Sequence, residues 1–292
     1  MKTAKFTLSI LSFATIVLLI AQPACPSDDA QRTKAELSRW VMNYYIQPDP
    51  DQFVSRVKIM AETGMLYDRS PGASPNANVM FLGKIMAANP GKIRGWMEAL
   101  ASLPAEEQQV LKKAVWYSGT AEGNAWLEEH GEAALAKGPR PMLLSNQQMP
   151  QLQPYHLDEL WEWFFATGEE QPVARIVSLF SLAHEPPKIG SLDLLPPPSK
   201  PTASATPKSE EGPKKSGEVY KMDDESLYKL RMQNYSILKP AMWSCTSLAI
   251  QQDRVLDLLR QMEKKHYHAG IKAWLARIIE IAESERAKQQ MK

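Results

Sequence analysis

The stretch LDELWEWFFATGEEQPVARIVSLF, residues 157–180, contains two apolar stripes separated by a short polar turn at Gly168. In both stripes the apolar residues recur every three or four positions, which is the period of one face of an α-helix. Glycine commonly follows the last turn of a helix because it adopts the left-handed conformation without steric cost. We therefore predict a helical hairpin, with these residues on its apolar faces: Leu157, Leu160, Trp161, Phe164, Phe165, Val173, Ile176, Val177 and Phe180.

The same helical period continues outward from this hairpin in both directions. Near the C-terminus, apolar residues stand at offsets 0, 3, 4, 7, 8 and 11 from Ile271. Thr33 and Glu36 form a predicted capping box at a helix start. Asp223 opens another predicted helix, which Pro240 should interrupt because proline lacks a backbone donor. No segment shows the strict alternation of a half-buried strand, so the sequence predicts an all-α fold.

Several predicted helices begin in a similar way, at successive intervals of about 40, 80 and 80 residues, and the start that a period of 40 would place near residue 131 is not visible. A period of this length is typical of stacked helical hairpins, which bury one face on each neighbour and form superhelices. An irregular bundle of helices with ordinary lengths would give a similar pattern. We expect either an irregular, α-solenoid-like array of helical hairpins or such a bundle. The helix starts that resemble one another are Asp51-Gln52-Phe53, Gly91-Lys92-Ile93, Gln171-Pro172-Val173 and Gln252-Asp253-Arg254-Val255.

Residues 1–24 have the layout of a signal peptide or membrane anchor. Lys2 and Lys5 precede the uncharged run FTLSILSFATIVLLIA, residues 6–21. A short basic segment followed by an apolar core is typical of a secretory signal. The positive charges lie only before the apolar run, which favours export of everything that follows. We expect an exported protein of the periplasm or cell envelope.

Cys25 is a candidate lipidation site. Ala24 and Cys25 match the end of a lipoprotein processing motif, in which a small residue precedes the modified cysteine, whereas Gln22 and Pro23 depart from it. Gln22 also fits poorly at the −3 position of an ordinary cleavage site. Three outcomes remain open: lipidation at Cys25, secretion after simple cleavage, and an uncleaved anchor. Membrane attachment would follow from the first or the third.

The remaining chain divides at a proline-rich segment. Residues 186–221 are rich in proline, serine and lysine and contain no aromatic residue before Tyr220. Such a composition buries too little apolar surface to offset chain entropy, so we predict a disordered linker. We expect a helical domain at residues 25–185 and C-terminal helices at residues 222–292 that pack on the first domain, because their apolar stripes need covering.

Composition argues against several classes of protein. The chain has 34 lysines and arginines against 33 aspartates and glutamates, whereas nucleic-acid-binding domains usually carry a basic excess. No cysteine or histidine stands at metal-ligand spacing near Cys25 or Cys245. Phosphate-binding, dinucleotide-binding and nucleophile-elbow motifs do not occur. We expect no nucleic-acid partner, no metal and no cofactor, and we identify no catalytic residue.

Two groups of residues are speculative binding candidates. Glu128 and Glu129 belong to the densest acidic cluster, and paired carboxylates can act in glycoside hydrolysis. The same spacing also suits the solvated face of any helix. Trp163 falls off the apolar stripe of its helix, so it is a candidate to stack on a sugar or to anchor a peptide. Packing against a neighbouring helix is the common alternative for such a tryptophan.

Two stretches carry a resemblance to other proteins. Residues 157–180 and the sequence AMWSCTSLAIQQDRVLDLL, residues 241–259, resemble segments of uncharacterised, exported, all-helical bacterial proteins. This resemblance implies export and an α-helical fold, and it implies no catalytic residues. We hypothesise a non-enzymatic helical scaffold in the cell envelope that binds a protein or peptide partner. The alternative hypothesis is an envelope protein that binds or hydrolyses glycan.

Overall fold

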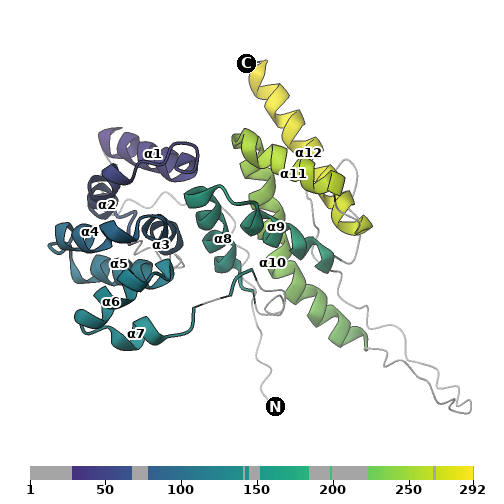
Figure 1. The fold of residues 1–292 in the computed structure, drawn as a ribbon. Coiled ribbons are helices and arrows are strands. Elements are labelled where there is room, and N and C mark those ends of the chain that lie inside the picture. Colours follow the sequence, from purple (N-terminus) through teal and green to yellow (C-terminus); the bar gives the residue numbers. More distant parts are fainter. Residues whose placement is uncertain are drawn as a thin grey trace, which may run out of the picture.

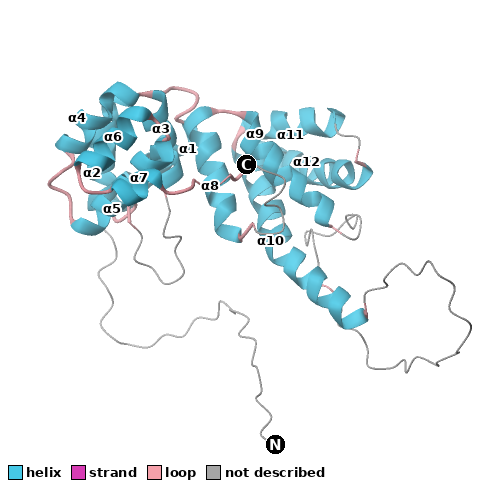
Figure 2. Cartoon of the chain, turned by 60° about the horizontal axis from the view of Figure 1, so that its bottom comes forward, coloured by secondary structure: helices cyan, strands magenta, loops and turns pink. Residues whose placement is uncertain are grey.

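The structure, a computed structural model, describes residues 28–67, 78–140, 142–144, 152–183, 198, 223–265 and 268–291. The regular structure of these residues is helical throughout (Figures 1 and 2), which confirms the predicted all-α fold. The segment at residues 1–24, Cys25 and the predicted linker, except for Pro198, lie outside the described residues.

The helices and short 3-10 turns follow one another with these bounds: α1 Asp28–Asn43, η1 Pro50–Gln52, α2 Phe53–Glu62, α3 Val79–Ala88, η2 Pro90–Lys92, α4 Ile93–Ala99, α5 Ala105–Ser118, α6 Ala121–Glu129, α7 Ala133–Lys137, α8 Pro154–Thr167, α9 Glu170–Ser178, η4 Leu179–Leu182, α10 Asp224–Gln251, α11 Asp253–Lys265 and α12 Ala269–Gln290. None of the helices in this described part combines the length and the apolar character that a membrane span requires.

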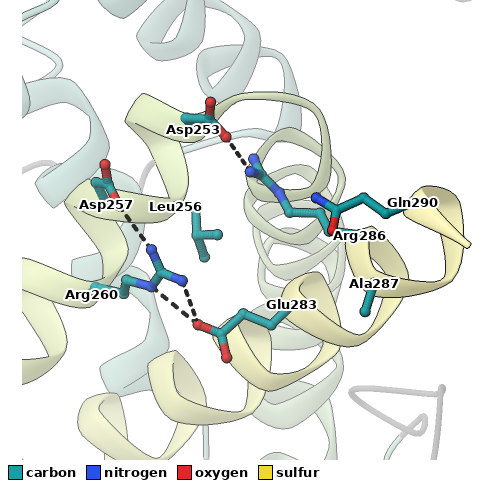
Figure 3. Close-up of a pocket in the computed structure, with 8 residues that line it drawn as sticks. All are labelled: Asp253, Leu256, Asp257, Arg260, Glu283, Arg286, Ala287 and Gln290. Atoms are coloured by element: carbon teal, nitrogen blue, oxygen red, sulfur yellow. Dashed lines mark hydrogen bonds and ion pairs between the residues drawn. The ribbon is translucent and has the colours of Figure 1, made fainter.

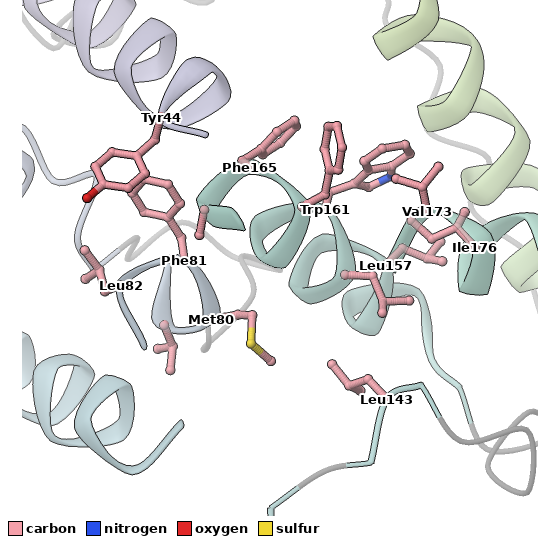
Figure 4. Close-up of a cluster of buried hydrophobic side chains, with 14 of the residues drawn as sticks. Tyr44, Met80, Phe81, Leu82, Leu143, Leu157, Trp161, Phe165, Val173 and Ile176 are labelled. Carbon is pink, nitrogen blue, oxygen red and sulfur yellow. The ribbon is translucent and has the colours of Figure 1, made fainter. Parts of the chain in front are cut away.

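Helix α3 is the centre of the first part of the fold, with α5 and α8 packed against it. The ring of Phe81 meets the rings of Trp40 in α1 and of Tyr44, directly after α1, edge to face at centroid distances of 5.2 and 5.6 Å. Figure 4 shows Tyr44 beside Phe81. Such geometry is favourable for aromatic pairs. Apart from Lys84, the helix is apolar, and a mostly apolar helix belongs in a core. The buried residues of α3 are Val79, Met80, Phe81, Leu82, Gly83, Ile85 and Met86.

The predicted hairpin at residues 157–180 is confirmed as helices α8 and α9. Gly168 ends α8 in the left-handed region at φ +71°, and its N–H donates to the carbonyl of Phe164 at 2.7 Å. The apolar face of α8 contacts both sides of the molecule, with Leu157, Trp161 and Phe165 among the buried side chains in Figure 4. The helical periodicity was sufficient to predict α8 and α9, because the apolar residues of both stripes are buried along the whole length of each helix.

Two turns that are 40 residues apart have the same local structure. Asp49 and Asn89 precede the 3-10 turns η1 and η2 with φ values of −130° and −134°. Each turn begins with a proline and leads directly into the helix α2 or α4. The two turns also touch, because Nζ of Lys92 lies 2.6 Å from a carboxylate oxygen of Asp51.

The three C-terminal helices pack on one another and on α8 and η4. The indole N–H of Trp161 in α8 donates to the hydroxyl of Ser244 in α10 at 3.0 Å. The side-chain amide of Gln252 donates to the carbonyl of Met42 in α1 at 3.4 Å. The Cys245 thiol is free and fully buried in α10. Burial raises the pKa of this thiol, so it remains protonated at neutral pH.

The prediction that Pro240 interrupts a helix is wrong, since α10 continues through it from Asp224 to Gln251. Apolar residues near the proline on both sides, Leu238 and Ala241 among them, are buried. Their packing offsets the roughly 3 kcal/mol that an internal proline costs. The break falls instead at Gln252, whose backbone is extended at φ −130° and ψ 121°.

The predicted capping box at Thr33 is also wrong. Helix α1 begins at Asp28, so that Thr33 lies inside the helix. Its hydroxyl donates to the carbonyl of Asp29, four residues earlier, at 2.8 Å. A threonine hydroxyl can satisfy this internal role as readily as it caps a helix, and the sequence pattern does not distinguish the two.

The close approach of α3 and α5 at Gly83 predicts a strong effect of Gly83→Ala. A Cβ atom at Gly83 of α3 would lie 2.8 Å from Cβ of Tyr117 and 2.9 Å from the carbonyl oxygen of Ala114, both on α5. We expect the variant to lose about 1–3 kcal/mol of unfolding free energy through overpacking, measured by urea denaturation.

Gly95→Ala in α4 is the matched control for this substitution. Nothing lies within 4 Å of a Cβ atom added at Gly95. Replacing this helical glycine should therefore stabilise the protein by about 0.5–1 kcal/mol through helix propensity. A Gly83→Ala variant that is as stable as Gly95→Ala would contradict the tight crossing of α3 and α5.

Candidate functional site

Glu128 and Glu129 do not converge on a common site. Both carboxylate oxygens of Glu129 accept from Nη2 of Arg94 in α4, at 3.0 and 2.8 Å. Glu128 instead lies 3.9 Å from Nζ of Lys137 in α7. The two side chains therefore connect α6 to two different helices.

Trp163 lies against other side chains of its own chain. Nζ of Lys84 in α3 stands 3.2 Å from the centre of the Trp163 ring, and the indole N–H donates to Glu169 at 3.1 Å. Burial lowers the pKa of Lys84, while the nearby Glu169 raises it. A cation over an aromatic face is a stabilising contact. This tryptophan helps to hold α8 on α3, and one face of its ring is covered.

A carboxylate that sequence reasoning missed, Glu162 of α8, caps the N-terminus of α3. The backbone N–H groups of Asn78 and Phe81 donate to its two oxygens at 2.7 and 3.4 Å. Asn78 has φ +64°, a left-handed conformation that asparagine tolerates better than most residues. Helix α3 has no side-chain cap within its own sequence, so this distant carboxylate supplies the missing acceptors.

The surroundings of Glu162 are strongly acidic. The pKa of Glu162 is raised to about 8, chiefly by burial and in smaller part by the nearby carboxyls of Glu159 and Asp158, while the two N–H groups act to lower it. Glu159 is 1% exposed. It is hydrogen-bonded to the hydroxyl of Tyr117, which together with burial raises the pKa of that tyrosine. Glu162 therefore bonds α8 to the start of α3, and Glu159 bonds α8 to α5.

A groove of about 500 Å³ lies between α11 and α12 (Figure 3). Side chains from the start of α11 face side chains from the second half of α12. The two helices are adjacent over this region because the apolar stripe of α12 packs on α10 and α11. The groove is lined by Asp253, Leu256, Asp257, Arg260, Glu283, Arg286, Ala287 and Gln290.

Two arginines organise the groove by ion pairs across it. Arg260 donates to Asp257 at 2.9 Å and to Glu283 at 2.6 and 3.1 Å. The hydrogen bond to Glu283 raises the pKa of Arg260. Arg286 pairs with Asp253 and donates to the carbonyl of Ala249 at 2.8 Å. Figure 3 shows both guanidinium groups between the two helices, each directed at carboxylates of the lining.

The carboxylates are more accessible than the guanidinium groups that they pair with. The side chains of Asp253, Asp257 and Glu283 are 89%, 54% and 48% exposed. Those of Arg260 and Arg286 are 42% and 21% exposed. Three acids and two arginines line the groove, so its rim presents a net negative charge to the solvent. An arrangement of this kind attracts cationic groups.

The sequence gives only a weak signal for this groove. Asp253 belongs to a predicted helix start, and the apolar stripe of the last helix ends at Ala282, just before Glu283. The lining charges come from two helices and look like ordinary solvated faces. Only the packing of α11 on α12 brings them together.

Within the described residues, histidine, cysteine and acidic side chains do not gather in a group of three that could hold a metal ion. Comparison of the chain with protein-family models, curated proteins and solved structures gives no match. The site is therefore interpreted from its own geometry.

The cap on α3 predicts a pH-dependent effect of Glu162→Gln. The glutamine keeps an oxygen that can accept from Asn78 but has no proton to titrate. A carboxyl with a higher pKa in the folded chain stabilises the fold fully below its unfolded pKa and loses this stabilisation as the pH rises to the folded value. For Glu162 the pH window runs from the ordinary value of 4.5 to about 8.

The wild-type protein should therefore lose unfolding free energy relative to Glu162→Gln between about pH 5 and pH 8, where each unit of pKa difference corresponds to ~1.4 kcal/mol. Thermal and urea unfolding at a series of pH values measure this difference. Parallel profiles for the two proteins would show that Glu162 does not titrate in this window.

Proposed function

We propose that this chain is a helical scaffold that binds a protein or peptide partner through the groove between α11 and α12, and that the partner contributes basic side chains. The observation that carries this proposal is the exposed acidic rim, formed by Asp253, Asp257 and Glu283 around two less exposed arginines. Exposed ion pairs contribute little to stability, so a partner can exchange with them at low cost.

The chemistry of the groove supports binding more than catalysis. General acid–base catalysis needs a group whose pKa lies near the working pH. The carboxylates of the groove form ion pairs with Arg260 and Arg286. The lining contains no cysteine, serine, histidine or lysine that could act as a nucleophile. The arrangement suits the recognition of cationic side chains.

We further propose that the protein is located in the cell envelope and that its helices form an array of hairpins. The basic and apolar N-terminal segment supports export to the cell envelope, and the resemblance to exported helical proteins agrees with this location. The matching turns at Asp49 and Asn89 support an array of helical hairpins. The glycan alternative receives less support, because Glu128, Glu129 and Trp163 contact side chains from several other parts of the chain.

Neutralising the rim tests the proposal directly. We expect the triple variant Asp253→Asn, Asp257→Asn and Glu283→Gln to bind a ten-residue lysine–alanine peptide about tenfold more weakly than the wild type, a loss of ~1.4 kcal/mol. Wild-type binding should also weaken between roughly 50 and 300 mM salt, because salt screens exposed charges. Isothermal titration calorimetry or fluorescence anisotropy measures both effects.

The matched control is a second triple variant with the same change in charge away from the groove: Asp29→Asn, Glu98→Gln and Glu122→Gln, which all lie on exposed helix surfaces. It should bind the lysine peptide like the wild type, and neither protein should bind a glutamate–alanine peptide. Capture of envelope proteins by the wild type and the control, but not by the rim variant, would identify the natural partner. Equal peptide binding by all three proteins, or cleavage of envelope glycan, would contradict the proposal.

A further inference from the structure

The first half of helix α10 extends away from the body of the molecule (Figures 1 and 2). α10 has 28 residues, and its buried residues all lie from Ile237 onward. The segment from Asp224 to Ser236 is about 20 Å long, at ~1.5 Å per residue. We refer to residues 224–239, which include one further turn, as the α10 arm.

The α10 arm carries a seam of large side chains. Tyr228, Met232 and Tyr235 stand at offsets 0, 4 and 7, and all three are half-buried. Lys239 and Trp243 continue the seam at offsets 11 and 15, and Trp243 is 69% exposed. From Tyr228 to Lys239 the steps are four, three and four residues, which is typical of a coiled-coil seam. Apolar surface on a projecting helix indicates a site of protein association.

The charges of the arm are separated by sign along its length. No acidic residue occurs between Ser226 and Gln252, so the acids lie at the start and the bases follow: Asp223, Asp224 and Glu225, then Lys229, Arg231 and Lys239. Two such helices in parallel would bring like charges together. In antiparallel order, the acidic start of each helix lies beside the basic part of the other.

We infer that the α10 arm pairs with the same arm of a second copy of this chain, in antiparallel order. A two-fold interface must be self-complementary, and the separated charges meet this requirement. With Met232 on the two-fold axis, Glu225 of each copy lies opposite Lys239 of the other. Tyr228 of one copy then packs beside Tyr235 of the other, which closes the seam.

The contacts within one chain are compatible with this pairing. Glu225 lies 3.5 Å from Nζ of Lys229, with both side chains well exposed. Nζ of Lys239 lies 5.5 Å from the centre of the Tyr235 ring. The exposed Glu225–Lys229 ion pair is weak and can be exchanged for a contact with a second chain. The interface is separate from the groove between α11 and α12, so each can be tested without the other.

Charge exchange across the interface provides the test. Sedimentation of the full chain should show a monomer–dimer equilibrium. Glu225→Lys and Lys239→Glu should each weaken dimerisation about tenfold, because each places like charges opposite one another twice in the dimer. The double variant should restore the wild-type dissociation constant to within about twofold, since the attractive pairs return with reversed sign. Circular dichroism checks that every variant remains folded.

Cross-linking distinguishes this seam from other surfaces of the arm. In a Cys25→Ser background, Met232→Cys should give a covalent dimer with a short bismaleimide, because the two side chains meet at the two-fold axis. Leu230→Cys, at an exposed position that lies off the seam, should not. A wild-type chain that stays monomeric, a double variant that fails to recover, or cross-linking at residue 230 but not at residue 232 would each overturn the inference.

Discussion

The burial of most of helix α3, from Val79 to Met86 except for Lys84, is the constraint on which the first part of the structure depends. Its apolar residues are covered by α1, α5 and α8, and Gly83 lets α5 approach to a distance that any Cβ atom would obstruct. A helix enclosed in this way has no solvent to satisfy its first N–H groups. The carboxylate of Glu162 accepts from two of them, so the acid is required by the burial and is not an independent feature.

Helix α8 transmits this constraint to the rest of the molecule. Glu162 points towards the start of α3, whereas the neighbouring residue Trp161 donates its indole N–H to Ser244 of α10. One helix therefore joins the core around α3 to the three C-terminal helices. The packing of α10, α11 and α12 on one another sets the spacing between α11 and α12. This spacing determines the groove at the proposed binding site. The groove is carried on packed helices and not on loops, so its ion pairs are held at defined positions.

The parts of the fold that the sequence predicts are those in which local pattern and burial agree. The hairpin at residues 157–180 has full apolar stripes and a glycine at the turn, and it is found as expected. Pro240 and Thr33 show where local signals fail. Burial around the proline outweighs its missing hydrogen bond, and a threonine hydroxyl serves equally inside a helix or at its start. The groove could not be predicted, because its charges belong to two helices whose adjacency is a tertiary property.

Native-state hydrogen exchange tests the central role of α3 most directly. The amides of α3 should exchange only when the whole domain unfolds, so that their opening free energy equals the free energy of global unfolding. The exposed first half of α10 should exchange much faster by local opening. Exchange of the α3 amides through a local opening, at a free energy well below that of global unfolding, would contradict the claim that this buried helix organises the fold.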